Sequence, residues 1–78
     1  MENKKKEYLE EENRDFAHML YELSIFTEQY DILRLCLTEY RSYLSDEEIQ
    51  DVYHRSCVLH GEKRVERWIE QYKNQGDN

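Results

Sequence analysis

The run Leu44-Ser45-Asp46-Glu47-Glu48-Ile49 carries the clearest structural signal in the chain. A serine at a helix start can accept a hydrogen bond from the backbone three residues later, and a glutamate at that later position can return one to the serine backbone. The pattern therefore predicts a helix that begins directly after Ser45. Gly61 should end this helix, because glycine readily adopts the left-handed backbone conformation common at helix ends. The residues expected on its inner face are Ile49, Val52, Tyr53, Ser56 and His60.

The preceding segment, residues 30–44, is predicted to be one helix and the central element of the fold. One apolar stripe runs along it, formed by Leu33, Cys36, Leu37, Tyr40 and Leu44. Ile32 and Tyr43 widen that stripe, and a helix that is apolar over so much of its circumference needs neighbours on two sides.

Two further helices are expected at the ends of the chain. In the first, residues 5–26, apolar positions recur at steps of three and four residues and are predicted to face the core: Phe16, Met19, Leu20, Leu23 and, one turn on, Thr27. In the last, residues 62–73, the inner face is expected to hold Val65, Trp68, Ile69 and Tyr72.

The predicted fold is all-α, a compact bundle of three to four helices. Proline is absent and only two glycines occur, whereas a strand-rich fold needs many such turn residues. Seventy-eight residues correspond to a single domain spanning 1–78, with frayed ends expected at about residues 1–6 and 74–78.

Charge is distributed unevenly along the chain. The formal net charge is −7, but the segment from Glu7 to Asp51 contains thirteen acidic residues and only three arginines, a net charge of −10. Such a segment attracts basic partners and repels nucleic acid and anionic membranes. Residues 1–6 contain lysines but are not followed by the apolar stretch of a signal peptide, and the chain has no apolar run of membrane-spanning length. We therefore expect a cytoplasmic protein that binds neither membrane nor nucleic acid directly.

No constellation of residues predicts catalysis. The sequence lacks a nucleophile placed beside a base and a glycine-rich phosphate loop. Two Asp-x-x-His pairs, Asp15 with His18 and Asp51 with His54, lie off the predicted apolar faces and are not expected to bind metal. Cys36 and Cys57 are expected to be free thiols in a reducing compartment. We expect no catalytic residue, no metal and no cofactor.

Acidic side chains form two clusters in the predicted structure. With about 100° between successive helix positions, one side of the first helix presents an acidic ridge made of Glu7, Glu11, Asp15, His18 and Glu22. Its steps of four residues rise about 6 Å, close to two steps of about 3.4 Å between phosphates of one DNA strand. The second acidic cluster crowds the start of the third helix and consists of Asp46, Glu47, Glu48 and Asp51.

Both clusters can be interpreted in two ways. The carboxylates of Glu7, Glu11, Asp15, Glu22, Asp46, Glu47, Glu48 and Asp51 could act as phosphate surrogates toward a basic partner. Alternatively, the ridge is an ordinary solvated face and the second cluster ordinary helix capping. The net of −10 favours the first interpretation, because self-repulsion on this scale costs stability that solubility alone does not require.

Some apolar residues remain after a single core is assigned. Tyr21 and Ile25 lie opposite the predicted core face of the first helix, and Leu35 and Val58 lie on the backs of the second and third helices. Such residues predict a contact surface, and a homodimer is the simplest use for it.

Small size, a helical pattern, strong acidity and the absence of a catalytic motif together resemble the small acidic inhibitors that bacteriophages use to take over host proteins. Some members of that class mimic DNA. The resemblance implies that the acidic side chains occupy the DNA-binding surface of a basic host protein, such as a histone-like nucleoid protein, a nuclease or a polymerase. The slightly basic end of this chain departs from that pattern.

The sequence thus supports two functional hypotheses. The first is a dimeric DNA-mimic inhibitor of a basic DNA-binding protein. The alternative is a helical adaptor that binds a host enzyme or transcription component through Tyr21, Ile25, Leu35 and neighbouring apolar groups, with the acids serving solubility.

Overall fold

The third helix, α3 (Asp46–His60), begins where the capping pattern predicts. The computed structural model describes the backbone of residues 2–76 and the side chains of residues 9–75. Ser45 Oγ accepts a hydrogen bond of 3.2 Å from the Glu48 backbone, and the Ser45 backbone N–H donates to Glu48 Oε1 at 2.9 Å. At the other end, Gly61 has φ = 91° and its N–H donates to the Cys57 carbonyl at 2.9 Å. The predicted start and end of this helix are both confirmed.

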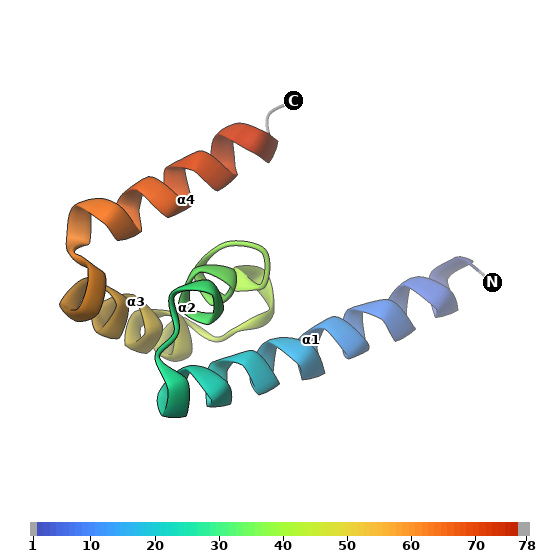
Figure 1. Ribbon diagram of the computed structural model, residues 1–78. Helices are drawn as coiled ribbons and strands as arrows, with labels where there is room; N and C mark the ends of the chain where they lie inside the picture. The colour runs from blue at the N-terminus through green and yellow to red at the C-terminus, as the bar shows by residue number, and fades with distance from the viewer. Residues whose placement is uncertain (1, 77–78) are drawn as a thin grey trace.

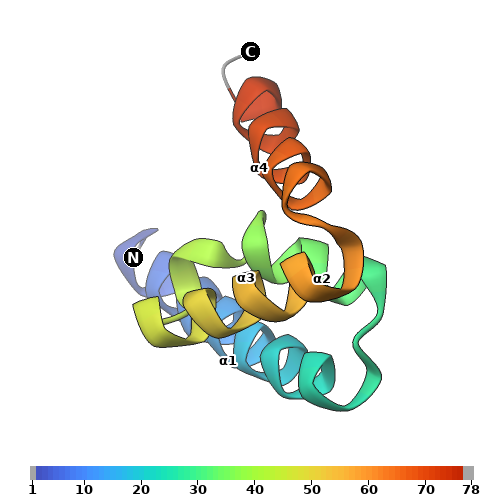
Figure 2. The ribbon, with the colours of Figure 1, turned by 90° about the vertical axis from the view of Figure 1, so that its left-hand side faces the viewer.

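Over residues 2–76 the fold consists of four α-helices, which confirms the all-α prediction. They are α1 (Glu2–Thr27), α2 (Tyr30–Leu37), α3 and α4 (Glu62–Gly76), with a 3₁₀ turn η1 (Arg41–Tyr43) between α2 and α3. Helices α1 and α4 lie on opposite sides of α2 (Figures 1 and 2). The ends expected to fray are helical from Glu2 and up to Gly76, whereas Met1, Asp77 and Asn78 lie outside the described residues. None of these four helices is both long and apolar enough to cross a membrane.

The prediction of one continuous helix over residues 30–44 is wrong. Helix α2 ends at Leu37, and Thr38 leaves the helical region with φ = −120° and ψ = −91°. The Thr38 hydroxyl donates to the Arg34 carbonyl at 2.7 Å, a local bond of the kind by which threonine competes with regular helix hydrogen bonding. The chain then turns through η1. Tyr40 and Leu44 nevertheless return to the core, so the apolar periodicity continued past the true end of the helix.

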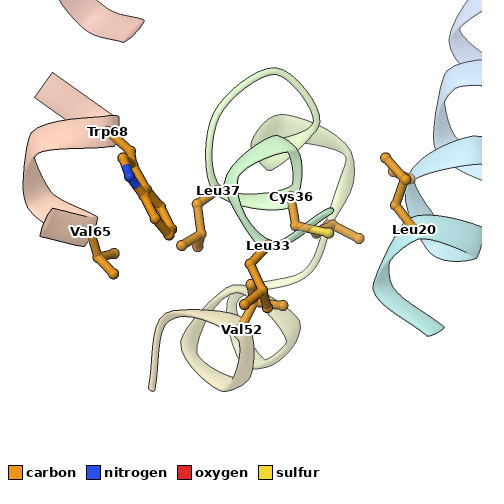
Figure 3. Packing of buried hydrophobic residues seen from close by; sticks show 9 residues of the cluster. Leu20, Leu33, Cys36, Leu37, Val52, Val65 and Trp68 are labelled. Atoms are coloured by element: carbon orange, nitrogen blue, oxygen red, sulfur yellow. The ribbon is translucent and has the colours of Figure 1, made fainter. Parts of the chain in front are cut away.

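Helix α2 is the centre of the core, as predicted. Its Leu33, Cys36 and Leu37 are fully or almost fully buried. Figure 3 shows them between Leu20 of α1, Val52 of α3, and Val65 and Trp68 of α4. This short helix therefore contacts each of the other three helices.

The predicted core face of α1 is wrong except at Leu20. The buried residues of this helix are Ala17, Leu20 and Ser24, whereas Phe16, Met19 and Leu23 are between 40% and 56% exposed and Thr27 is exposed. Small side chains at Ala17 and Ser24 allow α1 to lie close to its neighbours. The observed core face is consequently turned by about 80° from the face chosen by hydrophobicity.

This rotation can be tested by comparing two truncations of large apolar side chains. Leu33→Ala should lower the free energy of unfolding by about 2–5 kcal/mol, because it leaves a cavity in the core. Met19→Ala, at a position that periodicity assigned to the core, should change it by no more than about 0.5 kcal/mol, as for exposed positions. Urea denaturation followed by circular dichroism measures both. Equal losses would contradict the observed orientation of α1.

Candidate functional site

The outer surface of α1 presents large apolar side chains to solvent. We call this set the apolar stripe, and it consists of Leu9, Phe16, Met19, Leu23 and Phe26, which are between 40% and 84% exposed. The Phe16 ring also contacts the Tyr40 ring, with centroids 5.2 Å apart. Figure 1 shows the first half of α1 extending past α2 and α3, so this face continues beyond the body of the fold. The stripe was not predicted from the sequence, because the apolar periodicity assigned most of these residues to the core.

The acidic ridge borders the apolar stripe. Glu11, Asp15 and Glu22 are exposed, while the side chain of Glu7 lies outside the described residues. Asp15 and Glu12 line a shallow hollow together with Phe16 and Met19 of the stripe. His18 belongs to the ridge but turns to α3, where its Nδ1 lies 3.2 Å from Glu48 Oε2. One side of α1 thus combines apolar groups with carboxylates.

Only half of the second acidic cluster remains available to a partner. Asp46 and Glu47 are exposed. Glu48 is engaged by its own helix cap and by His18. Asp51 accepts hydrogen bonds from the Tyr21 hydroxyl and from Arg55, each of 2.9 Å. Glu48 and Asp51 therefore have structural partners within the chain that the phosphate-surrogate hypothesis did not foresee.

Arg55 joins α1 to α3 through several contacts. Its guanidinium donates to the Ser24 carbonyl at 2.7 Å, to Ser24 Oγ at 3.0 Å and to Asp51 Oδ2 at 2.9 Å. It also lies 5.9 Å from the centre of the Tyr21 ring. The role of Arg55 was not predicted, although it is the single Lys or Arg between residues 42 and 62 and follows Asp51 by one helical turn.

The hydrogen bonds of Asp51 shift two ionisation equilibria. The hydrogen bond from Arg55 favours the charged form of Asp51 and lowers the pKa of this carboxyl. The hydrogen bond to Asp51 stabilises the neutral phenol of Tyr21 and raises its pKa, with burial adding to the effect.

The apolar contact surface predicted from the sequence is available only in part. Ile25 and Val58 are exposed, at 47% and 72%. Tyr21 and Leu35 are half-buried and pack against the core. The expectation that all four residues remain outside the core is therefore wrong for Tyr21 and Leu35, because α1 and α2 are buried on more sides than the periodicity indicated.

The cysteines are free thiols. Cys36 is fully buried, and this burial raises its pKa to about 11, which keeps it protonated and unreactive at neutral pH. Within the part of the chain that the structure describes, no three His, Cys, Asp or Glu side chains gather into a potential metal site.

No protein-family model, curated protein or solved structure matches this chain. Its own surface is therefore what bears on its function.

The contacts of Asp51 predict a defined dependence of stability on pH. Because the pKa of Asp51 is lowered from 3.8, its stabilisation is present above pH 3.8 and is lost as pH falls through the lowered value. Because the pKa of Tyr21 is raised from 10.0, its stabilisation is present below pH 10.0 and is lost as pH rises through the raised value. Asp51→Asn should therefore destabilise the protein most between these limits.

Urea denaturation of the parent and of Asp51→Asn across this pH range measures the effect. The difference in their free energies of unfolding should shrink progressively in acid, since protonation removes the charge in the parent too. A difference that stayed constant down to pH 2 would show that the carboxylate charge contributes nothing to the contact.

Proposed function

We propose that this protein is a non-catalytic binding protein that recognises another protein through the outer face of α1. The observation that carries this proposal is the apolar stripe, in which five large apolar side chains are exposed along one helix. Isolated exposed apolar residues are ordinary on protein surfaces, whereas contiguous ones rimmed by polar groups mark interaction sites. The function supported best is that of an adaptor or regulator.

The apolar burial available at the stripe is similar in magnitude to the cost of association. Full burial of one Leu, Met or Phe side chain contributes about 1.5–3 kcal/mol. Because the five side chains of the stripe are between 40% and 84% exposed, covering what remains exposed would contribute roughly 4–8 kcal/mol, within the range of 4–15 kcal/mol that association costs in lost freedom of motion. The neighbouring carboxylates then decide which partners bind with net affinity, since complementary charge mainly governs specificity and association rate.

The proposed surface can be tested by immobilising the protein and measuring which proteins it captures from a lysate of the source cells. The double variant Met19→Gln with Phe26→Gln removes two apolar groups of the stripe and should lower the yield of a specifically bound protein at least tenfold. Val58→Gln is the matched control, because it makes the same kind of change at an exposed apolar residue of α3 and should bind like the parent. If the double variant retains the partner as well as the control does, the outer face of α1 is not the binding surface.

A second candidate function is inhibition of a basic DNA-binding protein by DNA mimicry. It is favoured by the exposed carboxylates of Glu11, Asp15, Asp46 and Glu47, which form no ion pair with any side chain among residues 9–75. Such groups on a rigid helix keep a fixed pattern that lysines and arginines can meet much as they meet phosphates.

Displacement of DNA from a histone-like nucleoid protein separates the two candidates. Under mimicry, replacing Glu11, Asp15 and Glu22 together by glutamine should weaken displacement at least tenfold, and added salt should weaken it steeply. Replacing Glu39, Glu62 and Glu70 by glutamine removes the same charge elsewhere on the surface and should have little effect. Equal displacement by both triple variants would exclude the ridge as a phosphate mimic.

A further inference from the structure

The apolar stripe has the spacing of a coiled-coil seam. Leu9, Phe16 and Leu23 are seven residues apart, and Met19 and Phe26 each follow one of them by three. In the heptad notation abcdefg these are positions a and d, the pattern by which one helix packs its side chains between those of a second. All five side chains are more than one third exposed.

The protein's own core does not use this seam. The buried residues of α1 are Ala17, Leu20 and Ser24, and of the seam residues Phe16 makes a ring contact with Tyr40 at the edge of the core. It therefore has two functional faces, one with small residues for its own fold and one with large apolar residues at heptad spacing. The second face resembles half of a two-helix interface.

We propose that the apolar stripe binds a single amphipathic helix of another protein, and that this helix carries lysine or arginine beside its own apolar seam. This inference rests on the proposed function and specifies the partner's chemistry. The seam from Leu9 to Phe26 spans about 26 Å, so a partner helix of about eighteen residues would cover it.

The carboxylates beside the stripe determine which sign of charge the partner helix should carry. Asp15 and Glu22 precede Phe16 and Leu23 in the heptad, at the flanking g positions whose charges set partner choice in coiled coils. Glu12 occupies the d position between Leu9 and Phe16 and is exposed. A docked helix would partly bury this carboxylate, which is costly unless a basic group faces it.

A second copy of the chain fits this seam poorly. Parallel pairing in register would place Glu12 against Glu12 of the other copy. Antiparallel pairing centred on Met19 would place it against Phe26. Both arrangements bury a carboxylate without a cation, which costs free energy, and the antiparallel arrangement also brings the two acidic ridges close together. Charge complementarity therefore favours a basic helix from a different protein over the homodimer expected from the sequence.

Two synthetic helical peptides of twenty-one residues provide the probe. Both carry leucine at the a and d positions, except for one d position that holds lysine in the first peptide and glutamate in the second. The flanking e and g positions are all lysine in the first peptide and all glutamate in the second. Fluorescence anisotropy of the labelled peptides should show the lysine peptide binding the intact protein at least tenfold more tightly. Equal affinities, or binding of neither peptide, would overturn the proposal.

Variants locate the binding and its charge preference. Met19→Glu should abolish binding of the lysine peptide, while Val58→Glu should leave it intact. Changing Glu12, Asp15 and Glu22 together to lysine should reverse the preference toward the glutamate peptide. The same change at Glu39, Glu62 and Glu70 adds equal positive charge elsewhere and should preserve the original preference. Circular dichroism confirms that each variant is folded, and an unchanged preference in the first triple variant would contradict the assignment.

Sedimentation of the parent and of Met19→Glu tests directly whether the stripe binds a second copy of the chain. A dimer of the parent that Met19→Glu converts to monomer would assign the stripe to self-association and overturn the proposal, whereas a monomeric parent supports it. Failure of the peptides leaves the proposed function standing if Met19→Gln with Phe26→Gln still loses the protein captured from lysate. If that capture is also unchanged, the proposed function fails as well.

Discussion

The contact between Arg55 and Ser24 fixes which way α1 faces. Two guanidinium hydrogen bonds reach the carbonyl and hydroxyl of Ser24, and the same guanidinium is held by Asp51 one turn away on α3. Ala17 and Leu20 then face the core, and the larger apolar residues of α1 are left outside. A polar contact of one side chain thus decides where the apolar surface of the protein lies.

Those parts of the fold that depend on local chemistry could be predicted from the sequence. The start of α3 follows from the reciprocal hydrogen bonds of Ser45 and Glu48, its end from Gly61, and the central place of α2 from its apolar circumference. The end of α2 could not be predicted, because Thr38 is compatible with a helix interior. The helix stops where the Thr38 backbone turns to φ = −120° and ψ = −91° and its N–H donates to the Leu35 carbonyl.

The orientation of α1 was unpredictable for a different reason. Hydrophobic periodicity identifies a face that avoids water, but it does not distinguish a face buried within the chain from one left for another molecule. Met19 and Leu23 have the spacing of core residues, whereas Ala17 and Ser24, which are the core residues, carry little hydrophobic signal. The exposure of Glu11, Asp15 and Glu22 was predictable from helix geometry. The internal partners of Glu48 and Asp51 were not, since they lie on another helix.

The exposed apolar stripe also bears on the fate of the protein in a cell. Contiguous apolar surface is an aggregation liability, and here it is present in the native state. A partner that covers the stripe adds to the apparent stability by mass action in proportion to the logarithm of its free concentration. Copies made in excess of such a partner would keep the stripe exposed and remain subject to chaperones and proteases. The steady-state abundance of this chain would then follow that of the molecule it binds.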